Sequence, residues 1–375
     1  MKIVFTGGGT GGHFYPVVAI AEKCVDIIEQ EKIVDAKLYF FAPSPYNRKI
    51  LFENGIRFRR VYAGKMRRHF SLLAPIEFLK TAIGVLKAIV SLWVVFPDVV
   101  FGKGGYGSFP TLLAAKFLRI PVIIHESDSI PGRANLWAGK FADRIALSYV
   151  EAASYFDKGK TAYTGQPVRK EVANPAINGA HEYLNLKEGI PVILILGGSQ
   201  GAQTINEIIL DALPELLKNY QVIHQTGNNN LKDVLETSDV ILEKNPNKDR
   251  YKAFGYLNDL AMRMSAGTAS LVISRAGSTI FEIAAWSLPS IIIPIADSNG
   301  DHQSKNAFNY ARTGASVVIE EKNLSPHLLL SEIERIMGNK SEQEKMKAAA
   351  HEFYHPDAAQ KIAREIVSIA LAHEK

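Results

Sequence analysis

Two glycine-rich turns, about half a chain apart, have the composition of phosphate-binding loops. They occupy residues 7–12 (GGGTGG), which His13 follows, and residues 197–202 (GGSQGA). Glycine lets backbone N–H groups approach an anion without a Cβ in the way, and a helix that follows adds partial positive charge at its first turn. Each turn follows an apolar run, at residues 2–5 and 192–196. The pattern predicts two units of strand, turn and helix.

Groups suited to proton transfer follow other strand-like runs in the first half of the chain. They are His13 and the run 125–128, which contains the carboxylates of Glu126 and Asp128. The second half offers Glu282, which can accept hydrogen bonds from a ribose diol. In a parallel sheet, such residues lie just beyond the carboxyl ends of the strands. The first half is therefore suited to proton abstraction and the second to holding a nucleotide.

A dinucleotide-binding dehydrogenase is the obvious rival, because Gly7, Gly9 and Gly12 formally match the GxGxxG pattern. That fold needs an acidic residue at the end of the second strand to hold the ribose. The second strand is predicted at 37–42, and it runs into Pro43-Ser44-Pro45 without an Asp or Glu. NAD binding is therefore disfavoured. The plainer alternative is that both turns only connect a strand to a helix.

Strand-like and helix-like segments alternate along the chain, which predicts an α/β protein with parallel sheets covered on both faces. At 375 residues the chain exceeds the size of a single core, so two Rossmann-like, doubly wound domains facing a shared cleft are expected. We predict an N-terminal domain at 1–165, a polar connector at 166–190 and a C-terminal domain at 191–355. The last residues, 356–375, are predicted to form a helix that can pack back on the N-terminal domain.

Cysteine usage and charge limit the compartment and the partners. The single cysteine, Cys24, cannot form an intramolecular disulfide, is predicted to be buried, and argues for a reducing compartment. The first strand begins at Lys2, which leaves no room for a signal peptide before the glycine turn. The net charge of +5 comes without the basic residues interleaved with aromatics that nucleic-acid binding needs. A cytosolic protein without a nucleic-acid partner is expected.

A basic run and an apolar segment follow each other between residues 65 and 96. We predict that Glu77, Lys80 and Lys87 prevent this segment from spanning a membrane, and that Pro75 and Gly84 weaken it further. It fits one or two amphipathic helices that lie on an anionic membrane, although the same face can pack on the sheet instead. The membrane-docking candidates are Lys65, Arg67, Arg68, Leu72, Leu73, Phe78 and Leu79.

Eight motifs in order resemble those of a known family. They are Gly8-Gly9-Thr10-Gly11-Gly12-His13 with Tyr15-Pro16, Gly104-Gly105-Tyr106, His125-Glu126, Pro131-Gly132 with Asn135, Pro167-Val168-Arg169, Gly197-Gly198-Ser199-Gln200-Gly201-Ala202 with Asn206, Ser274-Arg275-Ala276-Gly277, and Asp301-His302-Gln303 with Asn306-Ala307. The set resembles the MurG family, bacterial glycosyltransferases of peptidoglycan synthesis. These enzymes add N-acetylglucosamine to undecaprenyl-diphospho-muramoyl-pentapeptide, which turns lipid I into lipid II.

The resemblance implies a GT-B fold and an inverting transfer from UDP-N-acetylglucosamine, with the donor held mainly by the second domain. Ser199, Gln200 and Arg169 would serve the diphosphate, and Glu282 the ribose. The loop 256–260 would flank the uracil. His302 and Gln303 would contact the sugar hydroxyls. The full set of implied donor-binding residues is Arg169, Ser199, Gln200, Gly201, Asn206, Leu257, Arg275, Glu282, His302 and Gln303.

The resemblance also implies an acceptor site in the first domain. The glycine loops and their neighbours would take the acceptor diphosphate, through Thr10, Gly11, Gly12, Gly104, Gly105, Tyr106, Asp128 and Asn135. His13 precedes a helix predicted over 15–30, and a position at a helix N-terminus disfavours its cationic form, so a neutral imidazole would be available as the base. Glu126 is the alternative catalytic base, and the sequence leaves the choice between them open.

A metal is not required by this scheme, because a helix N-terminus and Arg169 can stabilise the leaving diphosphate. No cofactor is expected, with Mg²⁺ at most a stimulant through the substrate phosphates. The implied partners are UDP-N-acetylglucosamine, lipid I and the anionic inner leaflet, and the implied location is peripheral, at the cytoplasmic face of the plasma membrane. Such an enzyme serves cell-wall biogenesis, and through it cell shape and division.

The chain departs from the family pattern at three places. Ser127-Asp128 stands where the family has Gln-Asn, Gln166 stands where it has Asn, and the spacing from Arg275 to Glu282 is one residue short. A carboxylate lacks the donor hydrogens of an amide, so the contact of Asp128 with the substrate is in doubt. One residue rotates a helical side chain by about 100°, which puts the role of Glu282 in doubt.

Two other functions remain as alternatives. One is another GT-B enzyme, such as a UDP-N-acetylglucosamine 2-epimerase. The other is a nucleotide-sugar-binding module without turnover. The amphipathic segment counts against an epimerase, which needs no membrane, and the presence of both His13 and Glu126 favours chemistry over binding alone.

Overall fold

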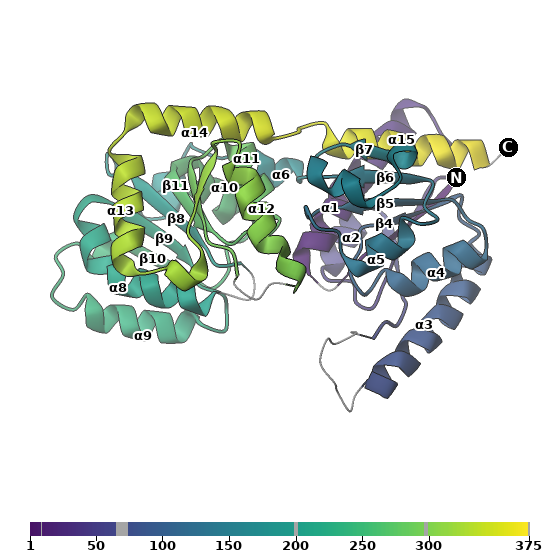
Figure 1. Cartoon of the computed structure of the whole chain (residues 1–375), viewed down its shortest axis with the longest axis horizontal. Coiled ribbons are helices and arrows are strands. Elements are labelled where there is room, and N and C mark those ends of the chain that lie inside the picture. The colour runs from purple at the N-terminus through teal and green to yellow at the C-terminus, as the bar shows by residue number, and fades with distance from the viewer. Residues whose placement is uncertain (9, 65–73, 199–201, 296–298, 374–375) are drawn as a thin grey trace. The chain divides into compact units, whose positions relative to one another are not determined.

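The computed structural model describes residues 1–8, 10–64, 74–198, 202–295 and 299–373. The chain divides into two compact units, Met1–Arg169 with His355–Lys375, and Lys170–Tyr354. Figure 1 shows the C-terminal helix, drawn in yellow, among the purple and blue elements of unit 1, although it is last in the chain. Each unit has its own parallel sheet.

Unit 1 contains a seven-stranded sheet in the order β3-β2-β1-β4-β5-β6-β7. Its strands are β1 (Lys2–Thr6), β2 (Lys37–Ala42), β3 (Ile56–Arg60), β4 (Val99–Gly102), β5 (Val122–Glu126), β6 (Arg144–Leu147) and β7 (Thr161–Tyr163). Its α-helices are α1 (Gly11–Gln30), α2 (Arg48–Glu53), α3 (Ala74–Val95), α4 (Phe109–Phe117), α5 (Arg133–Ala138) and α15 (Ala358–His373). The direction of winding reverses between β1 and β4, and in such sheets ligands bind beyond the strand ends at that point.

The C-terminal helix α15 is part of the core of unit 1. Its apolar residues recur every three or four positions, as Ala359, Ile362, Ala363, Ile366 and Val367, and they are buried in one cluster with α1 and β1. Such a stripe has the period of a helix face that packs on a neighbour. Residues from the two ends of the chain thus form one hydrophobic core.

The segment predicted as a polar connector, 166–190, differs from a free linker. It contains α6 (Lys170–Ala173) and α7 (Ala180–Tyr183). Val172, Ala180 and Leu184 are buried in a hydrophobic cluster of unit 2. Because these apolar residues need cover from water, most of the stretch folds onto unit 2, and the division between the units falls at Arg169.

Helix α3 corrects the argument that charges exclude a membrane span. Within the described residues it is the one helix, over Pro75–Val95, that is long and apolar enough to cross a membrane by length and composition. One side of the helix packs on the rest of unit 1. Ala88, Leu92 and Val95 are buried against the sheet of unit 1. A Cβ on Gly84 would clash with the carbonyl oxygen of Tyr62, so this glycine is a site of close packing.

Unit 2 contains a six-stranded sheet in the order β10-β9-β8-β11-β12-β13. Its strands are β8 (Val192–Leu196), β9 (Gln221–Gln225), β10 (Tyr251–Phe254), β11 (Ala269–Ser274), β12 (Ser290–Ile292) and β13 (Ser316–Val318). Besides α6 and α7, its α-helices are α8 (Gln203–Asn219), α9 (Leu231–Ile241), α10 (Asp259–Thr268), α11 (Thr279–Trp286), α12 (His302–Ala311), α13 (Pro326–Met337) and α14 (Lys340–Phe353). The winding reverses between β8 and β11, where the second glycine turn begins.

Candidate active site

Three loops of unit 1 converge beyond the carboxyl ends of β1, β4 and β5. Gly104 and Gly105 have φ of +89° and +76°, a region that favours glycine. A Cβ on Gly105 would lie 2.7 Å from the carbonyl oxygen of Gly8 and 3.3 Å from Nε2 of His13. A Cβ on Gly104 would lie 2.8 Å from Nδ2 of Asn135. The predicted acceptor loops are therefore brought together by close backbone approach.

His13 lies in the first turn of α1, which begins at Gly11 rather than at the predicted residue 15. Its Nδ1 is hydrogen-bonded to Oγ1 of Thr10 at 2.9 Å. Nε2 is the ring nitrogen beside the Gly105 loop. Burial, and then the charge of Lys103, lower the pKa of His13 to about 4, while Asp128 opposes the shift. The imidazole is therefore neutral near pH 7 and can accept a proton.

Glu126 ends β5 and is buried, with both carboxylate oxygens hydrogen-bonded. Oε1 accepts from the backbone N–H groups of Ser127 at 2.8 Å and Asp128 at 3.0 Å. Oε2 accepts from the N–H of Gly132 at 3.0 Å and from Nδ2 of Asn135 at 2.9 Å. Burial, and then the Asp128 carboxylate, raise the pKa of Glu126 to about 7. A side chain engaged in this way is suited to holding a loop.

Asn135 is buried on α5 and connects two of the converging loops. Besides Glu126, its Nδ2 donates to the carbonyl oxygen of His125 at 3.0 Å. His125 is itself buried, and its Nε2 is within hydrogen-bond distance of the Gly165 carbonyl and of Oγ of Ser148. The predicted acceptor residue Asn135 thus supports the 125–128 turn. Thr10, Tyr106 and Asp128 lie on the same group of loops, and Gly11 and Gly12 begin α1 directly after Thr10.

The sequence analysis missed Lys103, which follows β4 and is 1% exposed. Its Nζ donates to Oγ of Ser127. Burial lowers its pKa to about 8, while the carboxylates of Glu126 and Asp128 oppose the shift. The sequence contained an indication of this burial, because Lys103 lies between two glycines directly after an apolar strand. Spacing alone could not show that Ser127 and Gln166, which lie 24 and 63 residues away in the sequence, are its hydrogen-bonding partners.

Arg169 is the last residue of unit 1, although it was predicted to serve the donor together with residues of the second domain. Its guanidinium carbon lies 3.9 Å from the centre of the Tyr15 ring, and the residue is buried. The Tyr15 ring packs edge-on against Phe14 and Tyr46. Stacking on an aromatic ring fixes the orientation of the arginine side chain.

In unit 2, the predicted phosphate residues Ser199, Gln200 and Gly201 lie outside the described residues. Asn206 on α8 is buried within a polar network. Its Nδ2 donates to the carbonyl oxygen of Thr226 at 3.1 Å, and its Oδ1 is 3.0 Å from Nε2 of His224. Burial lowers the pKa of His224 to about 3, so His224 is neutral. Asn206 therefore ties the start of α8 to the end of β9.

The stretch from Arg275 to Glu282 contains the start of α11. The helix starts at Thr279, and Glu282 lies in its first turn. The flanking Phe281 and Ile283 are buried, whereas Glu282 is half-buried. The missing residue has therefore not rotated Glu282 into the core. Arg275 donates to Oε1 of Glu321 at 2.5 Å and to the Ile293 carbonyl, so its guanidinium already has partners within unit 2.

The side chain of Leu257 is not exposed beside the loop that was predicted to flank the uracil. Its side chain is buried in the core of unit 2, and its N–H donates to Oε1 of Gln225 at 3.1 Å. The exposed apolar side chains of the 256–260 loop are Tyr256 and Leu260. A base beside this loop would meet the backbone of Leu257, not its side chain.

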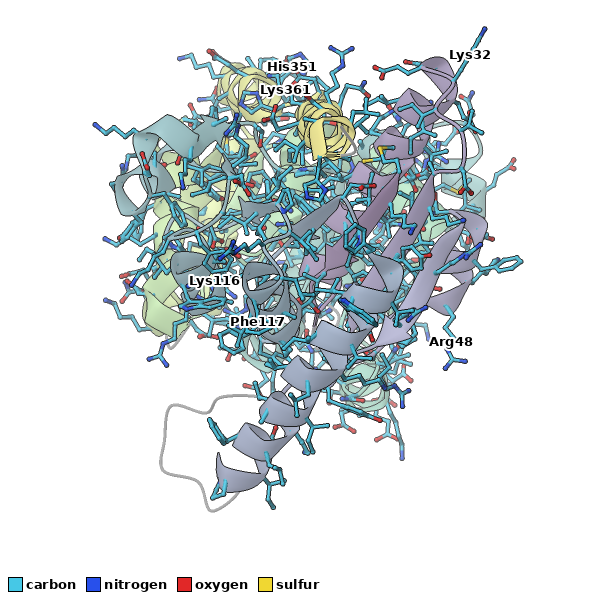
Figure 2. All side chains as sticks on the ribbon, turned by 90° about the vertical axis from the view of Figure 1, so that its right-hand side faces the viewer. Lys32, Arg48, Lys116, Phe117, His351 and Lys361 are labelled. Atoms are coloured by element: carbon cyan, nitrogen blue, oxygen red, sulfur yellow. The ribbon has the colours of Figure 1, made fainter. Side chains whose placement is uncertain are left out.

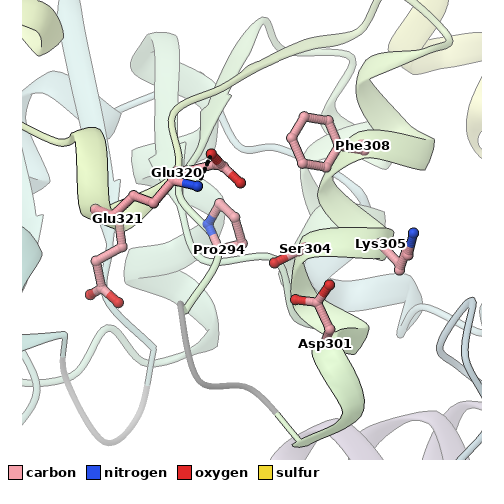
Figure 3. Close-up of a pocket in the computed structure, with 8 residues that line it drawn as sticks. Pro294, Asp301, Ser304, Lys305, Phe308, Glu320 and Glu321 are labelled. Atoms are coloured by element: carbon pink, nitrogen blue, oxygen red, sulfur yellow. Dashed lines mark ion pairs between the residues drawn. The ribbon is translucent and has the colours of Figure 1, made fainter.

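His302 and Gln303 lie in the first turn of α12, and Oε1 of Gln303 accepts from the N–H of Ile295 at 3.2 Å. The same helix lines a pocket together with the segments that follow β12 and β13 (Figure 3). The lining residues are Pro294, Asp301, Ser304, Lys305, Phe308, Glu320, Glu321 and Lys322. Glu320 is ion-paired with Lys322 at 3.0 Å, which the dashed line in Figure 3 marks. The pocket thus adjoins the predicted sugar-binding positions.

Potential metal ligands are dispersed in the part of the chain that the structure describes. No group of three or more His, Cys, Asp and Glu side chains is arranged there to hold an ion. Cys24 is a free thiol buried in α1, as predicted, and burial raises its pKa well above the ordinary value.

Two family models together cover most of the chain. The model for the glycosyltransferase family 28 N-terminal domain matches residues 3–147, and the model for the family 28 C-terminal domain matches residues 192–362. Each match falls on one parallel sheet and its glycine turn. The fold and the site therefore define a two-domain glycosyltransferase.

Solved structures confirm the predicted fold class. The crystal structure of MurG from Acinetobacter baumannii has a TM-score of 0.72 and 24% sequence identity, and the match covers 98% of this chain and 99% of that one. A UDP-GlcNAc 2-epimerase from Neisseria meningitidis has a TM-score of 0.67 at 14% identity, over 99% of this chain and 100% of that one. Because transferase and epimerase share the fold, the fold alone does not decide between them.

Curated relatives make that distinction. A protein of Natranaerobius thermophilus, named UDP-N-acetylglucosamine–N-acetylmuramyl-(pentapeptide) pyrophosphoryl-undecaprenol N-acetylglucosamine transferase, is 35% identical over 98% of this chain and 100% of its own length. A protein of Bacillus cereus with the same name, numbered 2, is 36% identical over 97% of this chain and 99% of its own. The chain belongs to this transferase family, the MurG family. The predicted membership and enzyme class are confirmed.

Proposed function

We propose that this protein transfers N-acetylglucosamine from UDP-N-acetylglucosamine to undecaprenyl-diphospho-N-acetylmuramoyl-pentapeptide, so that lipid I becomes lipid II. The observation that carries the proposal is a neutral imidazole, His13, at the start of α1 where three glycine-containing loops meet. The likeness to relatives named for this transfer supports the choice of substrates.

The reaction is an in-line displacement with inversion. The acceptor hydroxyl oxygen forms a bond to the anomeric carbon of the sugar, and the bond from that carbon to the β-phosphate oxygen breaks. UDP leaves with the electron pair, and the hydroxyl proton goes to Nε2 of His13. Glu126 is less suited to this step, because four N–H donors occupy its two oxygens. It holds the turn that borders the acceptor instead.

The leaving diphosphate gains stabilisation from the chain itself. Helix α8 begins just after the second glycine turn and has no acidic residue in its first turn, so its N-terminus favours an anion. Arg169 adds a cation that the Tyr15 ring orients. We infer that no cofactor is required and that Mg²⁺ on the substrate phosphates is at most stimulatory.

An assay of the purified protein with radiolabelled UDP-N-acetylglucosamine and a short-chain lipid I analogue tests the proposal. We expect label in the lipid product, and we expect EDTA to change the rate by no more than about two-fold, since binding groups replace the metal. Label that stays on UDP while the sugar changes configuration would establish the epimerase alternative. Binding without any turnover would establish the non-catalytic module.

Glu282→Ala is expected to weaken the donor site selectively. A ribose diol donates two hydrogen bonds to the carboxylate, and a bond to a charged acceptor contributes about 1.5–3 kcal/mol. The KM for UDP-N-acetylglucosamine should therefore rise about 100-fold, with a smaller change in kcat. Steady-state kinetics against donor concentration measure both constants. Glu352→Ala, at an exposed position of α14, is the matched control. A fall in kcat at unchanged KM would contradict the ribose role.

The exposed face of α3 supports docking on a membrane. The apolar residues that α3 leaves exposed, here called the α3 face, are Ile76, Phe78, Leu79, Ile83, Leu86, Val90, Trp93 and Val94. Helix α4 packs along α3 and ends at Phe117, which is also exposed (Figure 2). Exposed apolar surface of this extent marks a membrane or protein interface. Of the predicted docking residues, Phe78 and Leu79 belong to this face, and Lys65, Arg67, Arg68, Leu72 and Leu73 lie outside the described residues.

We infer that the α3 face inserts into the headgroup region of the inner leaflet, which makes the protein a peripheral enzyme of the cytoplasmic face. Phe78→Glu with Trp93→Glu should lower binding to vesicles that contain anionic lipid by at least about 10-fold, since each buried aromatic contributes about 1.5–3 kcal/mol. Co-sedimentation measures the binding. Val240→Glu, at an equally exposed apolar position on α9, is the control. Unchanged vesicle binding in the double variant would contradict docking through this face.

A further inference from the structure

Lys103 is a buried cation that the transfer step described above does not use. It directly follows β4, and its backbone N–H donates to the carbonyl oxygen of Thr6 at 2.8 Å, so the β1 and β4 strands fix its position. Its Nζ donates to Oγ of Ser127 and lies 3.5 Å from Oε1 of Gln166. Ser148 donates to the same oxygen of Gln166 at 2.8 Å. The ammonium therefore connects the end of β4 to the turn after β5 and to the segment before Arg169.

A buried ammonium destabilises a fold unless opposite charges face it. The carboxylates of Asp128 and Glu126 supply these charges from the turn after β5. Two histidines also feel the charge of Lys103: His13 on α1 and His125 on β5. Asp128 also acts on His13, whereas Glu126 acts on Lys103, so one cation and one carboxylate act directly on the neutral imidazole that the proposed function uses as base. Removing the charge of Lys103 would leave the Glu126 and Asp128 carboxylates without a counter-charge from this lysine, and removing a carboxylate would leave Lys103 with less compensation.

The partners of Lys103 coincide with two departures of this chain from the family pattern. Ser127 and Asp128 stand in place of a Gln-Asn pair, and Gln166 stands in place of an Asn. Ser127 and Gln166 contact Nζ of Lys103, and Asp128 interacts with its charge. Independent changes at the surface would not be expected to contact the same buried atom, Nζ of Lys103. The carboxylate of Asp128, which looked like a lost amide in the sequence, has a counter-charge in the structure.

We propose that Lys103, Ser127, Asp128 and Gln166 form one interdependent polar unit that holds the 126–128 turn beside His13, with Lys103 as its positioning residue. Its catalytic meaning rests on the proposed function, but the unit itself is a property of the fold. Lys103 is too deeply buried to touch a substrate, so it acts through the residues around it. The unit makes Asp128 part of the site's charge balance.

A double-substitution cycle tests the interdependence. We expect Lys103→Met to lower the Tm of unit 1 by roughly 10 °C or more, because the buried Glu126 and the half-buried Asp128 lose their opposite charge. Asp128→Asn should lower it less. The double variant should recover at least about half of the loss seen in Lys103→Met, because contacting charges are not additive. Lys140→Met, at an exposed position of unit 1, is the control. Losses that simply add would overturn the proposal.

A second measurement separates electrostatic positioning from a merely structural role. The C2 proton of His13, assigned by its absence in His13→Gln, is titrated by NMR. In Lys103→Met it should titrate about one pH unit higher than in the wild type, and in Asp128→Asn it should titrate lower. A fall in Tm without any change in this titration would overturn the positioning role. If Lys103→Met does not fold, recovery of folded protein in the double variant supports the unit, and failure of both contradicts it.

The same variants connect the unit to turnover. The acidic limb of kcat/KM should move to higher pH in Lys103→Met, in step with the His13 titration. Neither the Tm cycle nor the titration needs turnover. A wild type that transfers no sugar would therefore count against the proposed function, whereas an additive cycle or an unmoved titration would count against the unit.

Discussion

His13→Ala loses sugar transfer by about 10²- to 10⁴-fold in kcat, which is the range that a positioned general base contributes. The cause is the loss of the only imidazole that lies in the first turn of α1 beside the Gly105 loop. His13→Gln should be equally inactive, because its amide can hydrogen-bond to Thr10 but cannot accept the proton. Both variants should bind UDP as the wild type does, which isothermal calorimetry measures.

The control for this result is His373→Ala, which removes a half-exposed imidazole from the end of α15 in the same unit. It should retain wild-type kcat. The pKa of His13, lowered to about 4, adds a second expectation, that kcat/KM stays level on the acidic side down to about pH 5. If His13→Ala kept more than about a tenth of the wild-type kcat, the base would have to be sought elsewhere.

Glu126→Ala is expected to damage stability as well as activity. It leaves four N–H donors without their acceptor, and each unsatisfied buried donor costs about 1–3 kcal/mol. The Tm should fall by roughly 10 °C or more. Glu126→Gln should be intermediate, because its NH₂ group faces donors instead of accepting from them. Differential scanning calorimetry and the transfer assay are run on the same samples, with Glu151→Gln, at an exposed position, as the control.

The pH dependence distinguishes a structural Glu126 from a catalytic one. Its pKa in the folded protein, about 7, lies above the ordinary value of 4.5. The folded state therefore holds this proton more tightly, so its contribution to stability is full below pH 4.5 and is lost as the pH rises through about 7. Glu126→Gln should remove that slope relative to the wild type. A variant of wild-type Tm and pH dependence that had lost all transfer would instead identify Glu126 as the base.

The sequence predicted the parts of the site that depend on local chemistry. A glycine turn after an apolar strand has few alternatives to a strand-turn-helix unit, and both such units are present in the alternating α/β arrangement. His13 was placed correctly near a helix start, although the helix begins four residues earlier than predicted. Gly11 and Gly12, which were predicted as part of the glycine turn, form the start of this helix.

Other features depended on contacts between distant segments. The apolar segment from 74 to 95 has one composition but two faces, and only packing shows that Ala88, Leu92 and Val95 are covered while Trp93 is not. Leu257 reads as a loop residue beside a base, yet its side chain completes a core. The local spacing put the role of Glu282 in doubt, and only the structure shows that this side chain lies half-buried in the first turn of α11.

The sequence by itself determined the two parallel-sheet domains, the positions of the glycine turns and the membership of a transferase family, because strand period, turn chemistry and motif order are all written locally along the chain. Only the tertiary structure shows that α15 completes the core of unit 1 and that Glu126 accepts hydrogen bonds from four N–H donors. It also shows that the positive charge of Lys103 compensates the negative charge of Asp128. The physical reason is that burial and charge compensation depend on which distant segments come into contact, and the spacing of residues within one segment does not determine those contacts.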